Sequence, residues 1–217
     1  VKPSNGEQGA GITLPVEDYD DLVKAVKKAG GLSNRVIVEE LVEGNDLRIV
    51  VIGFQVVAAA IRKPPQIVGN GVNTIEELVN KLSRRREAAT NNESSIPINS
   101  DTRRCINSQG YAMNDILYEG EKILVRKTAN LHTGGTIHDV TDQLHPKLIE
   151  VAKLAAHAID IPVVGLDFMV ESPSKPFYSI IEANERPGLA NHDPQPTAER
   201  FIDFLFPNSI APNIEPK

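Results

Sequence analysis

The chain has 217 residues, of which 41% are hydrophobic and 24% are charged, a composition typical of a folded globular protein. Its net charge of −6 argues against nonspecific binding to nucleic acid or to an anionic membrane surface. The single cysteine, Cys105, excludes an internal disulfide, and no apolar run approaches the roughly 18 residues that a membrane-spanning helix requires. We therefore expect a cytoplasmic protein without nucleic-acid or membrane partners.

The hydrophobic pattern predicts an α+β fold in which antiparallel strands dominate. Apolar residues at helical spacing predict helices over residues 17–29, 74–86, 102–110, 146–158 and 197–206. Alternating or Val/Ile-rich segments predict strands over residues 12–16, 35–42, 46–53, 55–61, 122–125, 163–170 and 177–183. The more polar stretch 63–125 is interpreted as an insertion that decorates the main sheet. Because the chain opens at Val1 on residues typical of a strand end, we expect a longer polypeptide with a region before this one.

A lysine and a glycine-rich loop open the chain. Lys2 precedes Gly6, Gly9 and Gly11, and backbone N–H groups of such a loop can close over phosphate oxygens while the lysine supplies a positive charge. The lysine comes before the glycines, so this is not the P-loop pattern. A surface hairpin loop is the alternative.

Acidic residues follow along the strand predicted over 35–42. Glu39, Glu40, Leu41 and Val42 could form an exposed edge, or a hinge strand whose backbone pairs with a purine, with Asp46 holding the ribose hydroxyls. Later in the chain, Arg126 and Asn130 lie before a Gly-Gly turn, where cations and an amide would suit a developing phosphate or acyl-phosphate charge. Here too a plain surface loop is the alternative.

Three oxygen-bearing side chains fall on two predicted strands near the end of the chain. Asp167 interrupts an apolar strand, and an isolated carboxylate there is costly unless it is paired or bound to a cation. Glu182 and Asn184 alternate along the next strand and therefore face one side of it. If the two strands pair, the three groups share a face and suit Mg²⁺. A structural salt bridge from Asp167 to Arg62 or Arg186 is the alternative.

These segments, taken in chain order, resemble the ATP-grasp superfamily of carboxylate–amine ligases. The stretches Arg62–Gly71 and Arg126–Gly135 are similar to the ATP-grasp part of cyanophycin synthetase, whereas Glu182–His192 and Pro194–Phe201 are similar to N-acetylglutaminylglutamine synthetase. The resemblance implies an ATP-grasp fold without its N-terminal lobe. Residues 1–42 would be the remainder of the small lobe and 43–217 the large lobe.

The resemblance also implies roles for individual residues. Lys2 and the glycine loop would contact the ATP phosphates, residues 39–42 the adenine, and Asp46 the ribose. Asp167, Glu182 and Asn184 would bind Mg²⁺ (or Mn²⁺), and the candidates for stabilising the phosphoryl group are Arg48, Arg62, Arg126 and Asn130.

The implied reaction is ATP-dependent amide formation through an acyl-phosphate. The expected substrates are amino acids or N-acylated amino acids, first an N-acetylated glutamate or glutamine carboxylate with glutamine as the amine. A cyanophycin-type ligase for Asp or Arg and a nucleotide-binding module without ligase activity are the alternatives. The sequence leaves open a homo-oligomer and whether this region is active without the one that precedes it.

Overall fold

The computed structural model describes residues 1–5, 10–189 and 192–209. Its contacts divide the chain into two units. Unit 1 comprises Val1–Val42 and Pro64–Thr136, and unit 2 comprises Glu43–Lys63 and Ile137–Lys217. Among the helices that the structure describes, none has both the length and the apolar character needed to cross a membrane.

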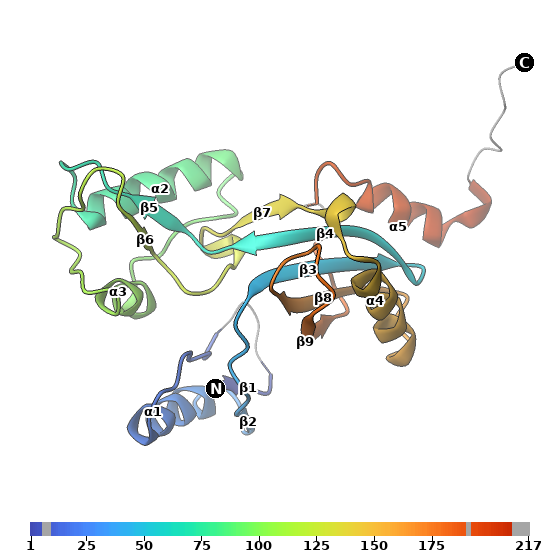
Figure 1. The fold of residues 1–217 in the computed structure, drawn as a ribbon, viewed down its shortest axis with the longest axis horizontal. Coiled ribbons are helices and arrows are strands. Elements are labelled where there is room, and N and C mark those ends of the chain that lie inside the picture. The colour runs from blue at the N-terminus through green and yellow to red at the C-terminus, as the bar shows by residue number, and fades with distance from the viewer. Residues whose placement is uncertain (6–9, 190–191, 210–217) are drawn as a thin grey trace, which may run out of the picture. The chain divides into compact units, whose positions relative to one another are not determined.

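Unit 2 is built on a five-stranded sheet with the strand order β7-β4-β3-β8-β9 (Figure 1). The strands are β3 (Asn45–Ile52), β4 (Gln55–Lys63), β7 (Thr136–Asp139), β8 (Val163–Val170) and β9 (Tyr178–Asn184). The predicted hairpin is confirmed, because β3 and β4 pair antiparallel around Gly53 and Phe54, which both have positive φ angles near 60°. β8 pairs antiparallel with both β3 and β9, so strands 163–170 and 177–183 are neighbours as expected.

One face of this sheet is wholly apolar. Leu47, Ile49 and Val51 of β3 point to this side and pack with Leu166 and Phe168 of β8. Helix α4 (Pro146–Ala158) covers them with Leu148, Val151, Ala152 and Ala156. The sequence predicted this helix with the same bounds, since Pro146 starts it and its buried residues recur at helical spacing.

The opposite face is divided along its length. One half is apolar, with Val50, Ile52 and Ala58, and helix α5 (Thr197–Leu205) packs Phe201 against it together with Leu189. The other half carries the charged residues Asp46 and Arg48 of the same strand β3. Side-chain alternation therefore places the charged residues on the face opposite the core and beside the helix-covered half.

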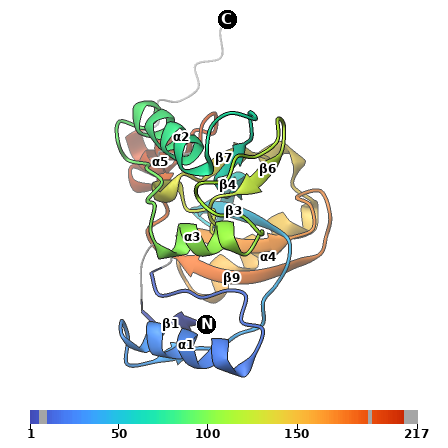
Figure 2. The same ribbon diagram turned by 90° about the vertical axis from the view of Figure 1, so that its left-hand side faces the viewer.

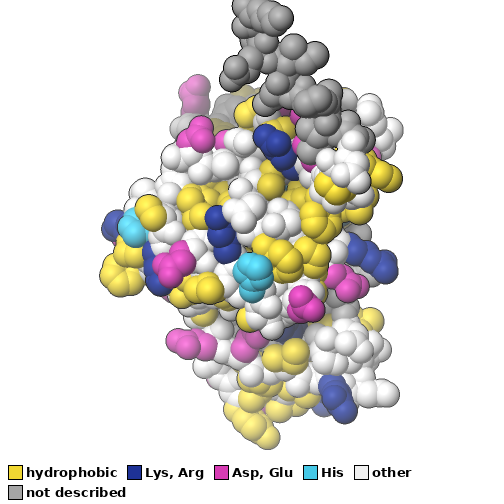
Figure 3. Space-filling view, turned by 90° about the vertical axis from the view of Figure 1, so that its right-hand side faces the viewer, with side chains coloured by type: hydrophobic (Ala, Val, Ile, Leu, Met, Phe, Trp, Pro, Cys, Tyr) yellow, Lys and Arg dark blue, Asp and Glu magenta, His cyan; other side chains and the backbone are white. Residues whose placement is uncertain are grey.

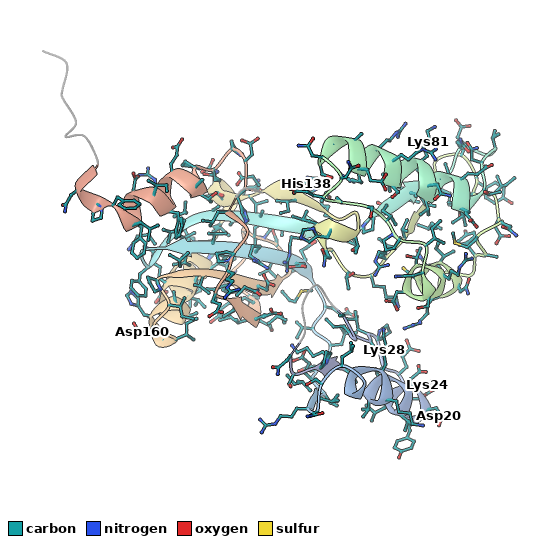
Figure 4. The ribbon with its side chains drawn as sticks, turned by 180° about the vertical axis from the view of Figure 1, so that it is seen from behind. Asp20, Lys24, Lys28, Lys81, His138 and Asp160 are labelled. Carbon is teal, nitrogen blue, oxygen red and sulfur yellow. The ribbon has the colours of Figure 1, made fainter. Side chains whose placement is uncertain are left out.

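Unit 1 contains two small sheets and three helices. Helix α1 (Tyr19–Gly30) lies beside strand β1 (Lys2–Pro3), which pairs with β2 (Val36–Ile37) (Figure 2). Lys24 and Lys28 extend from α1 (Figure 4), and Lys28 Nζ donates to the Ile12 carbonyl at 3.1 Å. The strand predicted over 12–16 is wrong, because these residues form irregular backbone, and the strand predicted over 35–42 is reduced to two residues.

The rest of unit 1 packs around a second apolar core. Strands β5 (Gln66–Val68) and β6 (Lys122–Leu124) pair, and helices α2 (Ile75–Ala89) and α3 (Ser100–Asn107) contribute to the same core. Helix α2 begins with the capping box of Thr74 and Glu77 that its sequence indicates. The predicted helices in this region are thus confirmed, although β5 was not expected.

Exposed hydrophobic side chains gather at the end of unit 2 that Figure 3 shows. Those that α5 contributes are Ile202, Phe204 and Leu205, and Phe206 follows directly after it. Phe54 stacks on His157 of α4 with the ring centroids 4.1 Å apart. The exposed surface of α5 therefore combines these apolar side chains with the charged residues Glu199 and Arg200.

We predict that Leu148→Ala lowers the free energy of unfolding by about 2–5 kcal/mol, because it leaves a cavity between α4 and the sheet. Leu148 is 0% exposed, whereas Leu154 on the same helix is 57% exposed. Leu154→Ala is therefore the matched control and should change stability by less than about 0.5 kcal/mol. Chemical denaturation measures both, and equal losses would contradict this packing.

Candidate active site

The charged half of the unit 2 sheet is organised around Asp167 of β8. Its carboxylate is 8% exposed and lies opposite Arg48 of β3 in the strand register. Arg48 donates from Nε to Asp167 Oδ1 and from Nη2 to Oδ2, the second bond at 3.2 Å. Arg62 of β4 approaches Oδ2 with Nη2 at 3.0 Å. One carboxylate therefore fixes two guanidinium groups that come from two other strands.

Asp46 of β3 completes this network. Its Oδ1 accepts hydrogen bonds from Arg62 Nε at 3.0 Å and Nη2 at 2.7 Å. Burial raises the pKa of Asp46, and the Arg62 charge opposes this rise. Burial acts to lower the pKa of Arg62, but the carboxylates of Asp167 and Asp46 outweigh it, and the pKa lies above its usual value. The two arginines and two aspartates are close together, and their formal charges sum to zero.

Glu182 and Asn184 of β9 lie beside Asp167 on this face. Glu182 is directly opposite Asp167 in the register, and Asn184 Nδ2 lies 3.4 Å from Asp167 Oδ2. Glu182 is exposed, and within the described residues no hydrogen bond or ion pair engages its carboxylate. The alternation argument thus correctly groups the three side chains. The salt bridge from Asp167 to Arg62, which the sequence offered as the alternative, is also present, and the sharing of the same carboxylate with Arg48 was not predicted.

Gly165 provides the room for Arg48. It lies two residues before Asp167 on β8, opposite Val50 in the register. A Cβ atom at this position would lie 2.6 Å from Arg48 Nη1 and 3.1 Å from Pro187 Cβ. The absence of a side chain at Gly165 therefore lets the Arg48 guanidinium lie against the strand and reach Asp167.

The turn between β9 and α5 carries a buried histidine, His192, to which the sequence reasoning gave no role. It is 4% exposed, and its Nδ1 is buried without a hydrogen-bond partner among the described residues. Burial and the charge of Arg48 lower the pKa of His192, Asp139 opposes this effect, and Arg62 adds to the lowering. A lone histidine in a loop carries no local sequence signal that would assign it a role.

Unit 1 carries the residues that the sequence predicts to bind the phosphates and the adenine of ATP. Lys2 Nζ forms a 2.7 Å ion pair with Glu39. Gly11 has a φ of 76°, whereas Gly6 and Gly9 lie outside the described residues. Ser4 and Asn5, which begin the glycine loop, line an open cavity of about 590 Å³ with residues 30–35. Glu40 and Leu41 are exposed and Val42 is partly buried, so this segment has accessible backbone.

Arg126 has a structural partner in unit 1. Its Nη1 donates to Asn99 Oδ1 at 3.2 Å and to Thr102 Oγ1 at 3.1 Å, at the start of α3. Asn130 Oδ1 accepts from the His132 backbone N–H at 2.8 Å and caps a short 3₁₀ turn. Arg126 is thus held by two side chains at the start of α3, and Asn130 is held by the local backbone.

The donors on the charged face of unit 2 are oxygen-rich. Within the described part of the chain, no group of three His, Cys, Asp or Glu residues could hold a metal ion. Asp46 is engaged by Arg62, and the predicted oxygen donors are the carboxylates of Asp167 and Glu182 with the amide of Asn184. Two carboxylates and an amide fit a hard cation that takes its other ligands from water or phosphate. The arrangement can therefore neutralise charge on a phosphorylated ligand.

A solved structure shares this fold. A bifunctional glutathione synthetase from Pasteurella multocida superposes on 95% of the chain with a TM-score of 0.60 and 24% sequence identity. The match covers 31% of that protein. The predicted ATP-grasp fold, with its helices and antiparallel sheets, is thereby confirmed. No protein-family model matches the chain.

The sequence comparison is more specific. Cyanophycin synthetase from Trichormus variabilis is 32% identical over 99% of the chain, and a bifunctional glutathione-biosynthesis protein from Clostridium perfringens is 32% identical over 95%. The chain spans only 25% and 28% of their lengths. The predicted resemblance to ATP-grasp ligases, and to cyanophycin synthetase among them, is confirmed.

We predict that Gly165→Ala destabilises unit 2 by about 1–3 kcal/mol, because the new methyl group displaces the Arg48 side chain. Gly30→Ala is the control, since its Cβ would meet only Val36 Cγ2 at 4.0 Å. Denaturant titration should show a loss for Gly165→Ala and none for Gly30→Ala. An unchanged unfolding midpoint in Gly165→Ala would show that Arg48 does not need this space.

Proposed function

We propose that the chain is the nucleotide-binding and catalytic part of an ATP-dependent carboxylate–amine ligase. The observation that supports this most strongly is the Arg48–Asp167–Arg62 arrangement beside Glu182 and Asn184. Similarity to cyanophycin synthetase and to a glutathione-biosynthesis protein supports the same class of reaction.

In the proposed reaction a substrate carboxylate oxygen attacks the γ-phosphorus of ATP, which forms an acyl-phosphate and releases ADP. An amine then attacks the acyl carbon, the C–O bond to phosphate breaks, and the amine loses a proton as the amide forms. Such phosphoryl transfer requires positioning and charge neutralisation more than a side-chain nucleophile. Arg48 and Arg62 are held side by side by Asp167 and would bind the oxygens that gain negative charge.

Asp167, Glu182 and Asn184 would hold Mg²⁺, which, when bound, neutralises the β- and γ-phosphate oxygens. Glu182 has a carboxylate that is free of described partners, and Asn184 uses its Nδ2 towards Asp167, which leaves its amide oxygen for a cation. Asp167 would serve both the cation and the arginines.

The other candidate residues receive roles in the same proposal. Lys2 and Gly11 would contact phosphates together with Gly6 and Gly9, the backbone of residues 39–42 would bind adenine, and Asp46 would reach the ribose. Asp46 must then share its carboxylate between the ribose and Arg62. For the transferred phosphoryl group we favour Arg48 and Arg62 over Arg126 and Asn130, because the latter two are bound to local backbone or helix-capping groups.

We predict that Mg²⁺ increases the affinity for ATP. In Glu182→Gln this increase in affinity should be smaller by roughly tenfold or more, because a ligand carboxylate is lost. Calorimetric titration of the intact protein with ATP, with and without Mg²⁺, measures this. Glu171→Gln is the matched control, since Glu171 is exposed, follows β8 and pairs with Lys175. ATP binding that ignores Mg²⁺ in the unaltered protein would contradict the ligase proposal.

The double variant Asp167→Asn, Glu182→Gln should release no ADP above background. Measured turnover equal to that of the unaltered protein would remove these residues from the site.

Two substrate classes follow from different observations. The segments Glu182–His192 and Pro194–Phe201, which resemble N-acetylglutaminylglutamine synthetase, favour an N-acetylated glutamate or glutamine carboxylate with glutamine as the amine. The similarity to cyanophycin synthetases favours the addition of Asp or Arg. We expect an ADP-release screen of amino acids and their N-acetyl derivatives to show turnover with one pair only. Release that needs Asp or Arg and a peptide acceptor would favour the second class.

A further inference from the structure

Strand β9 contains one residue more than its neighbour β8 at the point where the charged face begins. Phe168 of β8 pairs with Ile180, and the residue before it on β8, Asp167, pairs with Glu182. Ile181 therefore has no partner on β8, which is the pattern of a β-bulge. The extra residue comes directly before Glu182, one of the acids to which we assign the cation.

The bulge separates the part of β9 that packs on the core from the part that reaches the site. Before the bulge, Tyr178 lies opposite Val170 and Ile180 lies opposite Phe168, and both partners belong to the core on the α4 side. The first residue after the bulge, Glu182, lies on the charged face of the sheet. Bulges often occur beside active sites, where they redirect a side chain.

Two carboxylates that lie directly opposite each other are unfavourable in a regular sheet. Facing side chains have Cβ atoms about 4.5–5.5 Å apart, and like charges at this spacing repel. Asp167 and Glu182 form such a pair. Among the residues that the structure describes, Arg48 and Arg62 bond to Asp167, and no cation engages Glu182. A bulge increases the local twist of its strand, so it alters how these two facing side chains are directed.

We propose that Ile181 is a positioning residue, which as the extra residue of the bulge sets the Glu182 carboxylate relative to that of Asp167 so that both can bind one cation. Its role lies in its backbone. The Ile181 side chain is 38% exposed and lies outside both apolar clusters that the structure describes in unit 2. The inference rests on the proposed function, because the cation is the Mg²⁺ that accompanies ATP there.

The first test deletes Ile181 from the intact protein. The quantity compared is the ratio of the ATP affinities with and without Mg²⁺, the Mg²⁺ ratio, from calorimetric titration. Deletion leaves Asp167 and Glu182 as neighbours without the bulge, and we expect the Mg²⁺ ratio to fall roughly tenfold or more, as for other residues that orient metal ligands. The affinity for ATP without Mg²⁺ should stay within about twofold of the original, because no contact to the nucleotide is removed.

The same sheet offers a matched control away from the charged face. Val50 pairs with Ala58 and Val51 pairs with Val56, so Val57 of β4 is also an extra residue without a partner. Val57 packs on the half of the face that α5 covers. Its deletion should lower the thermal unfolding midpoint and leave the Mg²⁺ ratio unchanged.

Two substitutions that keep the extra residue decide the question if the deletion variant does not fold. Ile181→Ala removes the side chain but keeps a restricted backbone, so its Mg²⁺ ratio should stay within about twofold of the original. Ile181→Gly frees the backbone before Glu182, and the Mg²⁺ ratio should fall roughly threefold or more. The unfolding midpoints of both variants report on the fold.

Three results overturn the role of Ile181. The first is an unchanged Mg²⁺ ratio in a folded deletion variant. The second, where the deletion does not fold, is an equal Mg²⁺ ratio in Ile181→Ala and Ile181→Gly. The third is a parallel loss of ATP affinity with and without Mg²⁺ together with a lower unfolding midpoint, which indicates a purely structural residue. Absence of any Mg²⁺ effect in the unaltered protein is a different result, because it contradicts the ligase proposal itself.

Discussion

The shared carboxylate of Asp167 is the interaction on which the charged face of unit 2 depends. Two guanidinium groups repel each other, and both are largely withdrawn from water here, so they lie side by side only because an anion lies with them. Asp46 supplies the second negative charge. Removing one partner of such a buried group typically costs about 3–5 kcal/mol. The arginines are thus fixed in position without a ligand, which is the condition for effective electrostatic catalysis in the reaction that we propose.

The division of one sheet face explains how this polar group coexists with a stable fold. Helix α5 covers the apolar residues Val50, Ile52 and Ala58, while the charged residues of the same strands remain on the uncovered half. The turn carrying His192 lies between β9 and α5 in the chain. The helix that completes this second apolar cluster therefore also holds the end of the segment that leads into it, through the hydrogen bond from Thr197 to the Leu189 carbonyl.

Patterns local in the sequence predicted the local features of the fold. The helix at 146–158 and the strand at 163–170 have the predicted bounds, because their periodicity and end signals are unambiguous. Alternation also grouped Asp167 with Glu182 and Asn184. The salt bridge from Asp167 to Arg62 was one of two possibilities that the sequence left open, whereas the place of Arg48 on the same carboxylate depends on strand register across more than 100 residues, which no local pattern specifies. The short strand at 12–16 was predicted from β-branched residues that irregular backbone accommodates equally well.

The alternation of β3 has a consequence for folding accuracy. Asp46 and Arg48 interleave with Leu47 and Ile49, which are fully buried against α4. A shift of one residue in the pairing with β4 or β8 would turn the arginine and the aspartate into the apolar core and turn the leucine and isoleucine out. Burying unpaired charges would cost far more than the lost apolar contacts alone. The residues to which we propose a role in chemistry thus also disfavour every misaligned pairing of the sheet, so the same charges would support both the site and the strand register.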